Sequence, residues 1–348
     1  MGTAISVIVL GYGVEPHLTA CLSALDRELR EEDELILVDN GIEEGTVDRP
    51  ELPDGVIRIG EGVNLGFAGG CNLAAQKATR DVLVFVNSDA IVRPGSLAPL
   101  VAALEVDGVG IAGGCLRLAD QPHLVNAAGN PLQFTGVTWA GGCGEPAEDH
   151  AQPGPIPVAT GGFFAVRRPV WDALGGFDPA YFAYHEDTDL SLRCWMSGLA
   201  VEYVPTATAD HYYEFSRNPR KMYLVERNRL LTVLTDYPAV ILRTVLPALL
   251  VVEPALLVMA LLQGWAPQKL RAWWWLVRNV PLLRARRAKV QQGLRVSDEV
   301  IAGLMSARID PPMIEPPPGM SFVNAALSVY WAIARSAIRQ WGTVRSTA

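Results

Sequence analysis

Three groups of polar residues in this sequence have types and spacings suited to chemistry. The densest is Glu186-Asp187-Thr188-Asp189, where three carboxylates fall within four residues, directly after the aromatic stretch 181–185. The second is Asn87-Ser88-Asp89, and the third is the single His211. A carboxylate in a partly apolar pocket can have a raised pKa and serve as a general base. A carboxylate beside an amide suits a hard cation such as Mg2+ or Mn2+, held partly by substrate phosphates.

Each group also has an ordinary structural explanation. Carboxylates at a helix start cap free N–H groups and favour the helix dipole, which accounts for one of those at 186–189. Asn-Ser-Asp is common in turns, and a lone histidine is usually structural. The helix-start explanation does not account for the aromatic residues before Glu186. We therefore expect the three groups to converge on one site.

Short apolar runs alternate with helical stretches in the first hundred residues. Buried strands are predicted at 5–10, 34–39, 56–59 and 82–86. Helices are predicted at about 15–29, at 66–79 and after Pro94. This alternation predicts an α/β fold with a mostly parallel, doubly wound sheet flanked by helices. Such sheets bind ligands beyond the carboxyl ends of their strands, where Tyr12, Asp39 and Asp89 fall.

Glycines mark the start of the second predicted helix. Gly66, Gly69 and Gly70 could let backbone approach a ligand, and Asn64 and Asn72 add polar groups there. The pattern is not GxGxxG, and no P-loop lysine follows, so dinucleotide and NTPase sites are disfavoured. Further along, hairpins are predicted within 109–165, helices at 168–174, 187–197 and 217–235, and strands at 200–204 and 207–211.

The charge of the chain is unevenly distributed. The net charge is −8, yet residues 220–300 carry 13 Lys/Arg and 5 Asp/Glu. This asymmetry indicates a basic surface on an acidic body, facing anionic lipid. No nucleic acid partner is expected, because no RNA- or DNA-binding signature accompanies it. The five cysteines are scattered without a CxxC pair, which fits a reducing cytosol, and residues 1–10 lack the charged region of a signal peptide.

The segment after Pro238 is apolar and basic. Residues 245–262 are interrupted only by Pro247, Glu253 and Pro254, and Trp273-Trp274-Trp275 follows among basic residues. A spanning helix needs ~20 mostly apolar residues, so the run is of borderline length and its interruptions argue against a simple span. Tryptophans beside basic residues favour a helical element at a membrane interface. Packing on the core or another subunit, and a true span, are the alternatives.

A Pro-rich linker at 310–320 is expected to precede a final amphipathic helix within 321–348. We expect Ser321 to cap this helix, which could pack on its own domain or on a partner in a homo-oligomer. Its apolar face comprises Phe322, Ala326, Val329, Ile333, Ala337 and Trp341. The expected domains are 1–237, a helical region 238–309, the linker and this helix.

Taken in order, the motifs resemble family 2 glycosyltransferases with the GT-A fold, most closely the bacterial rhamnosyltransferase-like branch. The resemblance covers roughly residues 3–235. The matching pieces are Val7-Ile8-Val9 with Tyr12, Val38-Asp39-Asn40-Gly41, Asn64 to Asn72, Phe85 to Asp89, Thr160-Gly161-Gly162-Phe163, Gly176-Phe177-Asp178, Glu186 to Leu190 with Arg193, His211 and Arg227-Asn228. Two pieces depart from the family pattern. Gly13 stands where Asn is frequent, and Ser88 stands where Pro is frequent, so metal binding depends mainly on Asp89.

The resemblance implies roles for these residues. Asp187 would be the base that deprotonates the acceptor hydroxyl, and Asp89 with His211 would hold Mg2+ or Mn2+. Residues 1–113 would bind the donor and residues 114–237 the acceptor. The donor-binding residues would be Tyr12, Asp39, Asn40, Asn64, Gly69, Asn72, Asn87, Ser88 and Asp89. The acceptor-binding residues would be Gly161, Gly162, Phe163 and Glu186.

The implied activity is inverting, metal-dependent transfer of a hexose from a dTDP- or UDP-linked donor, with rhamnose from dTDP-rhamnose preferred. The acceptor would be a saccharide on polyprenyl diphosphate, in cell-wall or surface-polysaccharide synthesis. The enzyme would lie peripherally at the cytoplasmic face of the plasma membrane. The alternatives are a non-catalytic, glycosyltransferase-like nucleotide-binding or scaffold protein, and a nucleotidyltransferase. The second is disfavoured because residues 11–15 contain no basic side chain.

Overall fold

The computed structural model describes residues 3–43, 52–212, 218–312 and 319–342. The chain divides into two compact units. The first unit contains residues 1–130, 140–191 and 199–214, and the second contains 131–139, 192–198 and 215–348. The three sequence groups at 87–89, 186–189 and 211 all lie in the first unit.

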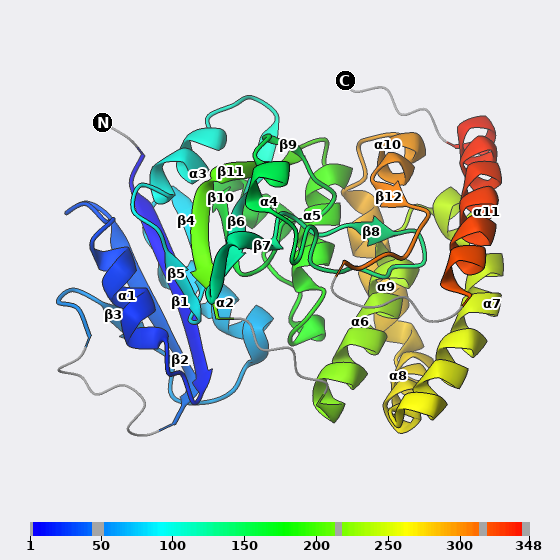
Figure 1. Cartoon of the computed structure of the whole chain (residues 1–348), viewed down its shortest axis with the longest axis horizontal. Coiled ribbons are helices and arrows are strands. Elements are labelled where there is room, and N and C mark those ends of the chain that lie inside the picture. Colours follow the sequence, from blue (N-terminus) through cyan, green and yellow to red (C-terminus); the bar gives the residue numbers. More distant parts are fainter. Residues whose placement is uncertain (1–2, 44–51, 213–217, 313–318, 343–348) are drawn as a thin grey trace. The chain divides into compact units, whose positions relative to one another are not determined.

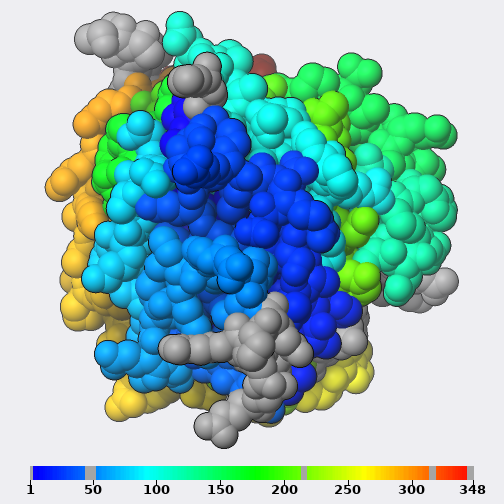
Figure 2. Space-filling view, turned by 90° about the vertical axis from the view of Figure 1, so that its left-hand side faces the viewer, coloured from blue at the N-terminus to red at the C-terminus, as the bar shows by residue number. Residues whose placement is uncertain are grey.

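Four parallel strands form the first half of a large sheet, in the order β3-β2-β1-β4 (Figure 1). They are β1 (Ile5–Gly13), β2 (Glu34–Ile42), β3 (Ile57–Ile59) and β4 (Val82–Asn87). β1 is central, with Val7 opposite both Leu35 of β2 and Val84 of β4. Both faces of β1 are buried, which explains its continuous apolar run. Figure 2 shows the surface that the N-terminal residues, in blue to cyan, form over this half of the sheet.

Helices account for the burial of both sheet faces. The helices before residue 110 are α1 (Leu18–Asp26), α2 (Gly66–Lys77) and α3 (Leu97–Ala103). Leu22 of α1 and Leu100 of α3 share a core with alternate residues of the strands, such as Val7 and Val84. The opposite face carries Phe85, whose ring stacks on those of Phe164 and Trp171. Trp171 belongs to α4 (Arg168–Leu174), and α5 (Glu186–Met196) follows it.

The second half of the sheet is mixed, in the order β10-β6-β11-β5. Its strands are β5 (Ala90–Val92), β6 (Val109–Leu118), β10 (Phe163–Arg167) and β11 (Ala200–His211), with β7 (Gln121–Ala127) and β9 (Gly154–Pro155) beside them. β10 runs antiparallel to β4 and β6, whereas β11 runs parallel to β6. The predicted α/β fold is confirmed, with parallel pairing dominant only in the first half. Within 109–165, the short connection between β6 and β7 makes a hairpin, whereas parallel pairs need long crossovers.

The second unit is mainly helical. Its helices are α6 (Pro219–Asp236), α7 (Ala239–Gln263), α8 (Ala266–Arg278), α9 (Val280–Gln292), α10 (Asp298–Gly303) and α11 (Met320–Trp341). Two short strands, β8 (Leu132–Gln133) and β12 (Met305–Ser306), pair in parallel. Among the described residues, only α7 is long and apolar enough to cross a membrane by length and composition. Part of the predicted linker, residues 313–318, lies outside the described residues.

A buried cluster of charges joins α6, α7 and α8. The side chain of Arg229 bonds both Glu226, at 3.0 Å, and Glu253. Lys269 Nζ lies 2.7 Å from Glu226 Oε2 and 3.0 Å from Glu253 Oε2, and the indole N–H of Trp273 donates to Glu253 at 2.8 Å. Two positive and two negative groups balance, so these charges are buried without net charge. The cluster fixes the side of α7 that faces the protein.

Candidate active site

The carboxyl ends of the parallel strands bring several predicted residues to one edge of the sheet. In register, Gly11 of β1 lies opposite Asp39 of β2, and Leu10 lies opposite Asn87 of β4. Tyr12 follows at the end of β1, and its ring is half exposed. Ser88 and Asp89 lie between β4 and β5, at the same edge. The order and parallel register of β2, β1 and β4 therefore bring these predicted donor residues to the sheet edge at which open α/β sheets bind ligands.

Asp89 and His211 meet at this edge, as expected from the sequence. β11 pairs with β5 so that His211 lies opposite Ala90. The Nε2 atom of His211 is 3.1 Å from Oδ1 of Asp89, and the backbone N–H of Tyr212 donates to the Asp89 carbonyl at 2.9 Å. The imidazole is buried, whereas the Asp89 carboxylate is 38% exposed. One group of the pair is thus rigidly held and the other faces solvent.

Asn126 of β7 completes the arrangement, although no sequence pattern indicated it. Its Oδ1 atom lies 2.8 Å from Nδ1 of His211, so Nδ1–H donates and Nε2 presents its lone pair to Asp89. Two acceptors then face each other unless a proton or a metal cation lies between them. A buried histidine that donates its second N–H to an oxygen is the usual arrangement around a metal ligand. The Asp89–His211 pair therefore fits a divalent cation.

The protein supplies few ligands for such a cation. Within the described ranges, no group of three or more His, Cys, Asp and Glu side chains is placed to hold a metal. Mg2+ and Mn2+ sites that handle nucleotides commonly use one or two protein groups, with substrate phosphates and water filling the remaining positions. A two-residue site suits a metal that arrives with, or is completed by, a diphosphate.

Asp187 lies at the start of α5, against the loop that precedes β10. The backbone N–H of Gly161 donates to its Oδ2 at 3.1 Å, and the N–H of Thr188 donates to its Oδ1 at 2.7 Å. Burial raises the pKa of Asp187 above its ordinary value, although these hydrogen bonds act in the opposite direction. The side chain remains partly accessible. A held, partly accessible carboxylate with a raised pKa suits a general base.

Glu186 differs from its neighbour. It is buried, and its Oε2 atom has no hydrogen-bond partner among the described residues. Burial, and then the nearby Asp187 carboxylate, raise the pKa of Glu186 well above its ordinary value. Two adjacent carboxyl groups so placed do not both ionise readily, and the burial of Glu186 favours its neutral form.

Backbone contacts connect the base to the Asp89–His211 pair. Asn87 N donates to the carbonyl of Gly162 at 2.9 Å, and Phe163 pairs with Val86 as β10 begins. Gly162 follows Gly161, which bonds Asp187, and Asn87 lies two residues before Asp89. The three sequence groups are therefore neighbours in the first unit, although up to 122 residues separate them in the chain.

The loop before α5 has an unusual backbone. Phe182, Tyr184 and His185 have φ values of 65°, 69° and 66°, in the left-handed region that non-glycine residues avoid. Each such residue costs about 1–3 kcal/mol, so surrounding contacts must impose the conformation. The Phe182 carbonyl accepts the N–H of Ala68 at 3.1 Å, close against Gly66, whose own φ is +74°. This packing orients the start of α5 and hence Asp187.

Asn72 helps to hold the same loop. Its Nδ2 donates to the Phe177 carbonyl at 2.7 Å, and its Oδ1 accepts the Phe177 N–H at 3.0 Å. Phe177 itself is buried against the rings of Phe85 and Trp171. Both ends of the Asn72 amide are thus engaged with the loop. The aromatic residues that precede Glu186 partly serve this packing, since Tyr181 is fully buried while Tyr184 is exposed.

The predicted donor residues Asp39, Asn40 and Asn64 organise neighbouring backbone. Asn40 Oδ1 accepts the N–H of Leu65 at 2.8 Å, and Asn64 Oδ1 accepts that of Gly66 at 2.9 Å. Partial burial would raise the pKa of Asp39, but its hydrogen bonds with Arg58, Ile42 and Gly41 hold this pKa below its ordinary value. Asp39 is consequently ionised, with Arg58 2.6 Å from its Oδ2. No motif in the sequence indicated that Arg58 would contact Asp39.

Glu15 is a further residue that the motifs did not indicate. Its Oε1 accepts the N–H of Tyr12 at 2.8 Å, and burial raises its pKa, with the Asp89 charge adding to the effect. The loop after β1 brings Glu15 close to Ser88 and Asp89. In the sequence, Glu15 is a single acidic residue in this loop and belongs to no motif.

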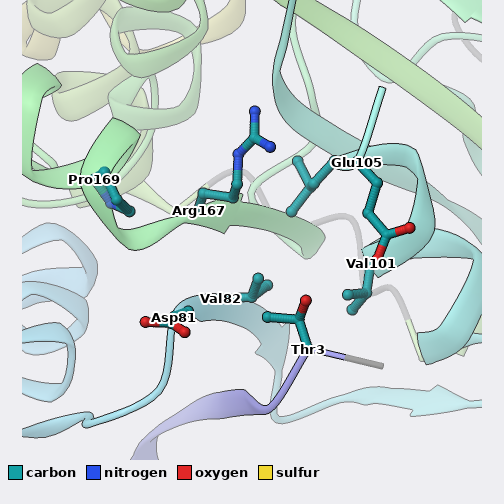
Figure 3. Close-up of a pocket in the computed structure, with 8 residues that line it drawn as sticks. Thr3, Asp81, Val82, Val101, Glu105, Arg167 and Pro169 are labelled. Carbon is teal, nitrogen blue, oxygen red and sulfur yellow. The ribbon is translucent and has the colours of Figure 1, made fainter. Parts of the chain in front are cut away.

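A small cavity lies at the opposite, amino-terminal edge of the sheet (Figure 3). Its volume is about 170 Å³, and Thr3, Asp81 and Arg167 are among its lining residues. Ligand pockets usually measure about 300–1,000 Å³. Asp81 immediately precedes β4, whereas Asn87 ends it, so this cavity and the candidate site are at opposite ends of that strand.

Comparisons with known proteins bear on the family and the fold. The model of the family "Glycosyl transferase family 2" matches residues 6–175, which include Asp39, Asp89 and Gly161. The N-acetylglucosaminyl-diphospho-decaprenol L-rhamnosyltransferase of Mycobacterium tuberculosis is 27% identical over 238 residues, covering 61% of this chain and 77% of that protein. Residues 6–175 belong to glycosyltransferase family 2. The resemblance stated from the motifs is confirmed.

Other glycosyltransferases are similar over shorter shares of their length. Human polypeptide N-acetylgalactosaminyltransferase 15 is 28% identical over 216 residues, 57% of this chain and 34% of that protein. A crystal structure of GalNAc-T7 with UDP, GalNAc and Mn2+ matches with a TM-score of 0.57 and 18% identity, covering 68% of this chain and 48% of that one. This likeness concerns the fold, and it confirms the GT-A type for this family 2 glycosyltransferase.

Proposed function

We propose that this glycosyltransferase moves a hexose, with rhamnose from dTDP-rhamnose the preferred candidate, to a hydroxyl of a lipid-linked saccharide. The observation that carries the proposal is the contact series from His211 and Asp89 through Asn87 and Gly162 to Asp187. It supports the proposal because it connects the pair that would bind a cation to the residue that would act as the base. The similarity to a rhamnosyltransferase named for a decaprenol-diphosphate substrate supports the choice of donor and acceptor.

The donor nucleotide is assigned to the ends of β1, β2 and β4. Asp39, held ionised by Arg58, accepts hydrogen bonds from the base, and Asn87 and Ser88 lie on the ribose side. Tyr12 is exposed and available to the base, whereas Gly69, Asn40 and Asn64 shape the start of α2. Asn72 acts on the donor pocket through the loop at Phe177. A dTDP- or UDP-linked sugar fits these roles.

Asp89 and His211 would hold Mg2+ or Mn2+. The bound metal would neutralise charge that develops on the departing nucleoside diphosphate. Asn126 keeps the His211 ring in the orientation that presents Nε2. The exposed Asp89 carboxylate supplies the negative charge that makes a cation favourable at this position.

Asp187 would act as the base of an inverting displacement. Its carboxylate takes the proton of the acceptor hydroxyl while that oxygen bonds to the anomeric carbon and the nucleoside diphosphate leaves. One displacement inverts the anomeric centre and requires no covalent intermediate. Gly161 and Gly162 would line the acceptor side, and neutral Glu186 would donate a hydrogen bond to the acceptor. The Phe163 side chain, by contrast, is fully buried in the core and can support this side only through packing. A buried neutral acid beside an ionised base limits repulsion between the two.

The enzyme is assigned to cell-wall or surface-polysaccharide synthesis, peripherally at the cytoplasmic face of the plasma membrane. The basic residues of α7–α9 and the exposed tryptophan of α8 support the membrane location. A homo-oligomer is compatible with the exposed apolar face of α11.

A donor screen followed by a transfer assay tests the proposal. Thermal shifts with dTDP-rhamnose, UDP-hexoses and GDP-hexoses, each with and without Mn2+, should show a metal-dependent rise for one nucleotide class. The stabilising donor is then incubated with a polyprenyl-diphosphate-linked saccharide, and product stereochemistry is read by NMR. Retention of configuration would contradict the single displacement. Donor binding without any transfer would favour the alternative of a nucleotide-binding scaffold.

A further inference from the structure

A basic cleft in the second unit has no part in the site described above. Its volume is about 530 Å³, and it is bounded by the N-terminal end of α7, one face of α9 and the start of α10. Three arginines line it, Arg243, Arg284 and Arg287, against a single lining carboxylate, Asp298, which is itself buried. The cleft therefore has a net positive charge.

None of the three arginines forms an ion pair with another of the described residues. Arg243 and Arg284 make no ion pair or hydrogen bond with other residues in the ranges that the structure describes. Arg287 donates to the carbonyl oxygens of Leu234 at 3.0 Å and Tyr237 at 2.8 Å, which positions it. The charge of the buried Asp236, which is itself paired with Arg286, acts on Arg287 without forming an ion pair among the described residues. Guanidinium groups pair with phosphate oxygens in bidentate hydrogen bonds.

The helix dipole adds to this charge. Ala239 and Val240, the first residues of α7, line the cleft, and no side chain caps this end of the helix. The N–H groups of a helix's first turn have no partner within the helix and attract anions. α7 has 25 residues, so its dipole is fully developed. Arginines and a helix N-terminus together favour a phosphate group.

An apolar strip leads away from the cleft along α7. It begins beside Arg243 and comprises Leu246, Pro247, Leu250, Val251, Pro254, Val258, Leu261 and Leu262, all exposed. The strip contains no charged side chain, and only 22% of the most apolar 18-residue stretch of α7 is buried. A soluble surface rarely exposes so long an uninterrupted apolar row.

The buried charges exclude a simple transmembrane orientation for α7. Glu253, the single acidic residue of the helix, is bonded to Arg229, Lys269 and Trp273. Moving α7 into a bilayer would strand Glu253 in hydrocarbon and leave the buried cations Arg229 and Lys269 with Glu226 as their one carboxylate in this cluster, an unbalanced buried charge that is strongly unfavourable. The helix can keep these contacts and still place its outer strip in the upper part of one leaflet.

Neighbouring helices have surfaces of the same kind. α11 packs beside α7, with the Tyr330 hydroxyl donating to the Thr244 carbonyl at 2.6 Å, and it exposes Phe322, Val329 and Ile333. On α8, Arg278 lies 5.1 Å from the exposed Trp274 ring, a pairing suited to lipid headgroups. The exposed charges of α7, α8 and α9 are all basic: Arg243, Arg271, Arg278, Arg284 and Lys289.

We infer that the three-arginine cleft binds the phosphate of an anionic lipid, whose apolar chain lies along the exposed strip of α7. The phosphate can belong to a membrane phospholipid or to the polyprenyl diphosphate of the acceptor, and the second source rests on the proposed function. The same geometry serves both, since each ligand joins a phosphate to a long apolar chain.

Vesicle flotation of the full chain tests the cleft. Wild type should float with phosphatidylglycerol vesicles and with phosphatidylcholine vesicles containing polyprenyl diphosphate, but weakly with phosphatidylcholine alone. R243Q/R284Q should bind both anionic vesicles about 25-fold more weakly, because each basic residue near an anionic surface contributes about a factor of five. R27Q/R308Q, with two exposed arginines outside the cleft, is the matched control. Recruitment by only one of the two anionic vesicles would identify the source of the phosphate.

Three results would overturn the inference. They are equal flotation of R243Q/R284Q and wild type, equal losses in both double variants, and a concentration-dependent dimer that fails to bind vesicles. The last would assign the strip to a second copy of the chain. Transfer by wild type to a water-soluble acceptor analogue, assayed without vesicles, reports on the proposed function separately.

A depth measurement tests the orientation of α7. All five native cysteines are buried, so a polarity-sensitive dye can be attached selectively at Leu250→Cys or Leu262→Cys. Both dyes should lie at similar, shallow depths on phosphatidylglycerol vesicles. A deep position 250 with a shallow position 262 would indicate a span and contradict the inference.

Discussion

His211 Nε2 lies 3.1 Å from Asp89 Oδ1, and on the other side of the ring His211 Nδ1 lies 2.8 Å from Asn126 Oδ1. Three strands meet to make this arrangement, since Asp89 precedes β5, Asn126 belongs to β7 and His211 ends β11. The ring is therefore fixed in orientation before any ligand arrives. The consequences for metal and donor binding can be measured.

Asp89→Ala should remove the metal dependence of donor binding. The variant loses the exposed carboxylate that would neutralise the cation, while the proposed donor contact at Asp39 is unchanged. Isothermal titration with the stabilising nucleotide sugar should give the same affinity with and without Mn2+ for the variant, but a higher affinity with Mn2+ for wild type. Asp120→Ala, an exposed carboxylate in the β6–β7 turn, is the control. Undiminished Mn2+ dependence in Asp89→Ala would refute the metal assignment.

Asn126→Leu should weaken Mn2+ binding by roughly 10–100-fold, the usual effect of losing a partner that orients a metal ligand. Without Asn126 Oδ1, the ring of His211 loses this acceptor for Nδ1–H and can turn or change tautomer. Mn2+ affinity is read by electron paramagnetic resonance in the presence of nucleoside diphosphate. Asn126→Asp retains the acceptor and should restore most of the affinity. Equal loss in both variants, with equal melting temperatures, would contradict a role in orienting His211.

Asp187→Asn should lower kcat by roughly 100-fold or more and leave donor affinity nearly unchanged, as expected for loss of a general base. In wild type, kcat should fall on the acid side at a pH above 3.8, because burial raises the pKa of Asp187 from that ordinary value. Asp172→Asn, an exposed site on α4, controls for removal of a carboxylate. Retained turnover in Asp187→Asn would remove it from the base role.

Glu186→Gln should make folding stability less dependent on pH. The folded-state pKa of Glu186 is raised well above 4.5, so its protonated form favours folding, and that contribution is lost as pH rises from 4.5 through the raised pKa. Glutamine mimics the protonated form at every pH. The melting temperature of the variant relative to wild type should therefore be higher at pH 8 than at pH 5. A difference that does not change with pH would show that Glu186 is ionised in the folded protein.

Much of the fold could be predicted because its signals are local. The runs 5–10, 34–39 and 82–86 are buried on both faces in the structure, as continuous apolar sequence indicates. Parallel register then brings Tyr12, Asp39 and Asn87 to one edge without further information. The left-handed residues 182, 184 and 185 could not be foreseen, since an aromatic-rich sequence carries no sign of positive φ when packing imposes it.

The amino-acid sequence by itself indicated where the buried strands of the first half of the sheet lie, which family the motifs resemble, and that Asp89, Asp187 and His211 are candidate site residues. These signals are local, because apolar periodicity and short motifs can be recognised over a few residues. Only the tertiary structure decided that Asn126 orients His211, that Arg58 pairs with Asp39, and which way α7 and α11 face. Periodicity shows which residues of a helix share a face, but not what covers that face. Glu253 illustrates the difference: within an apolar run it is only an interruption, whereas its contacts with Arg229 and Lys269 anchor α7 to the protein.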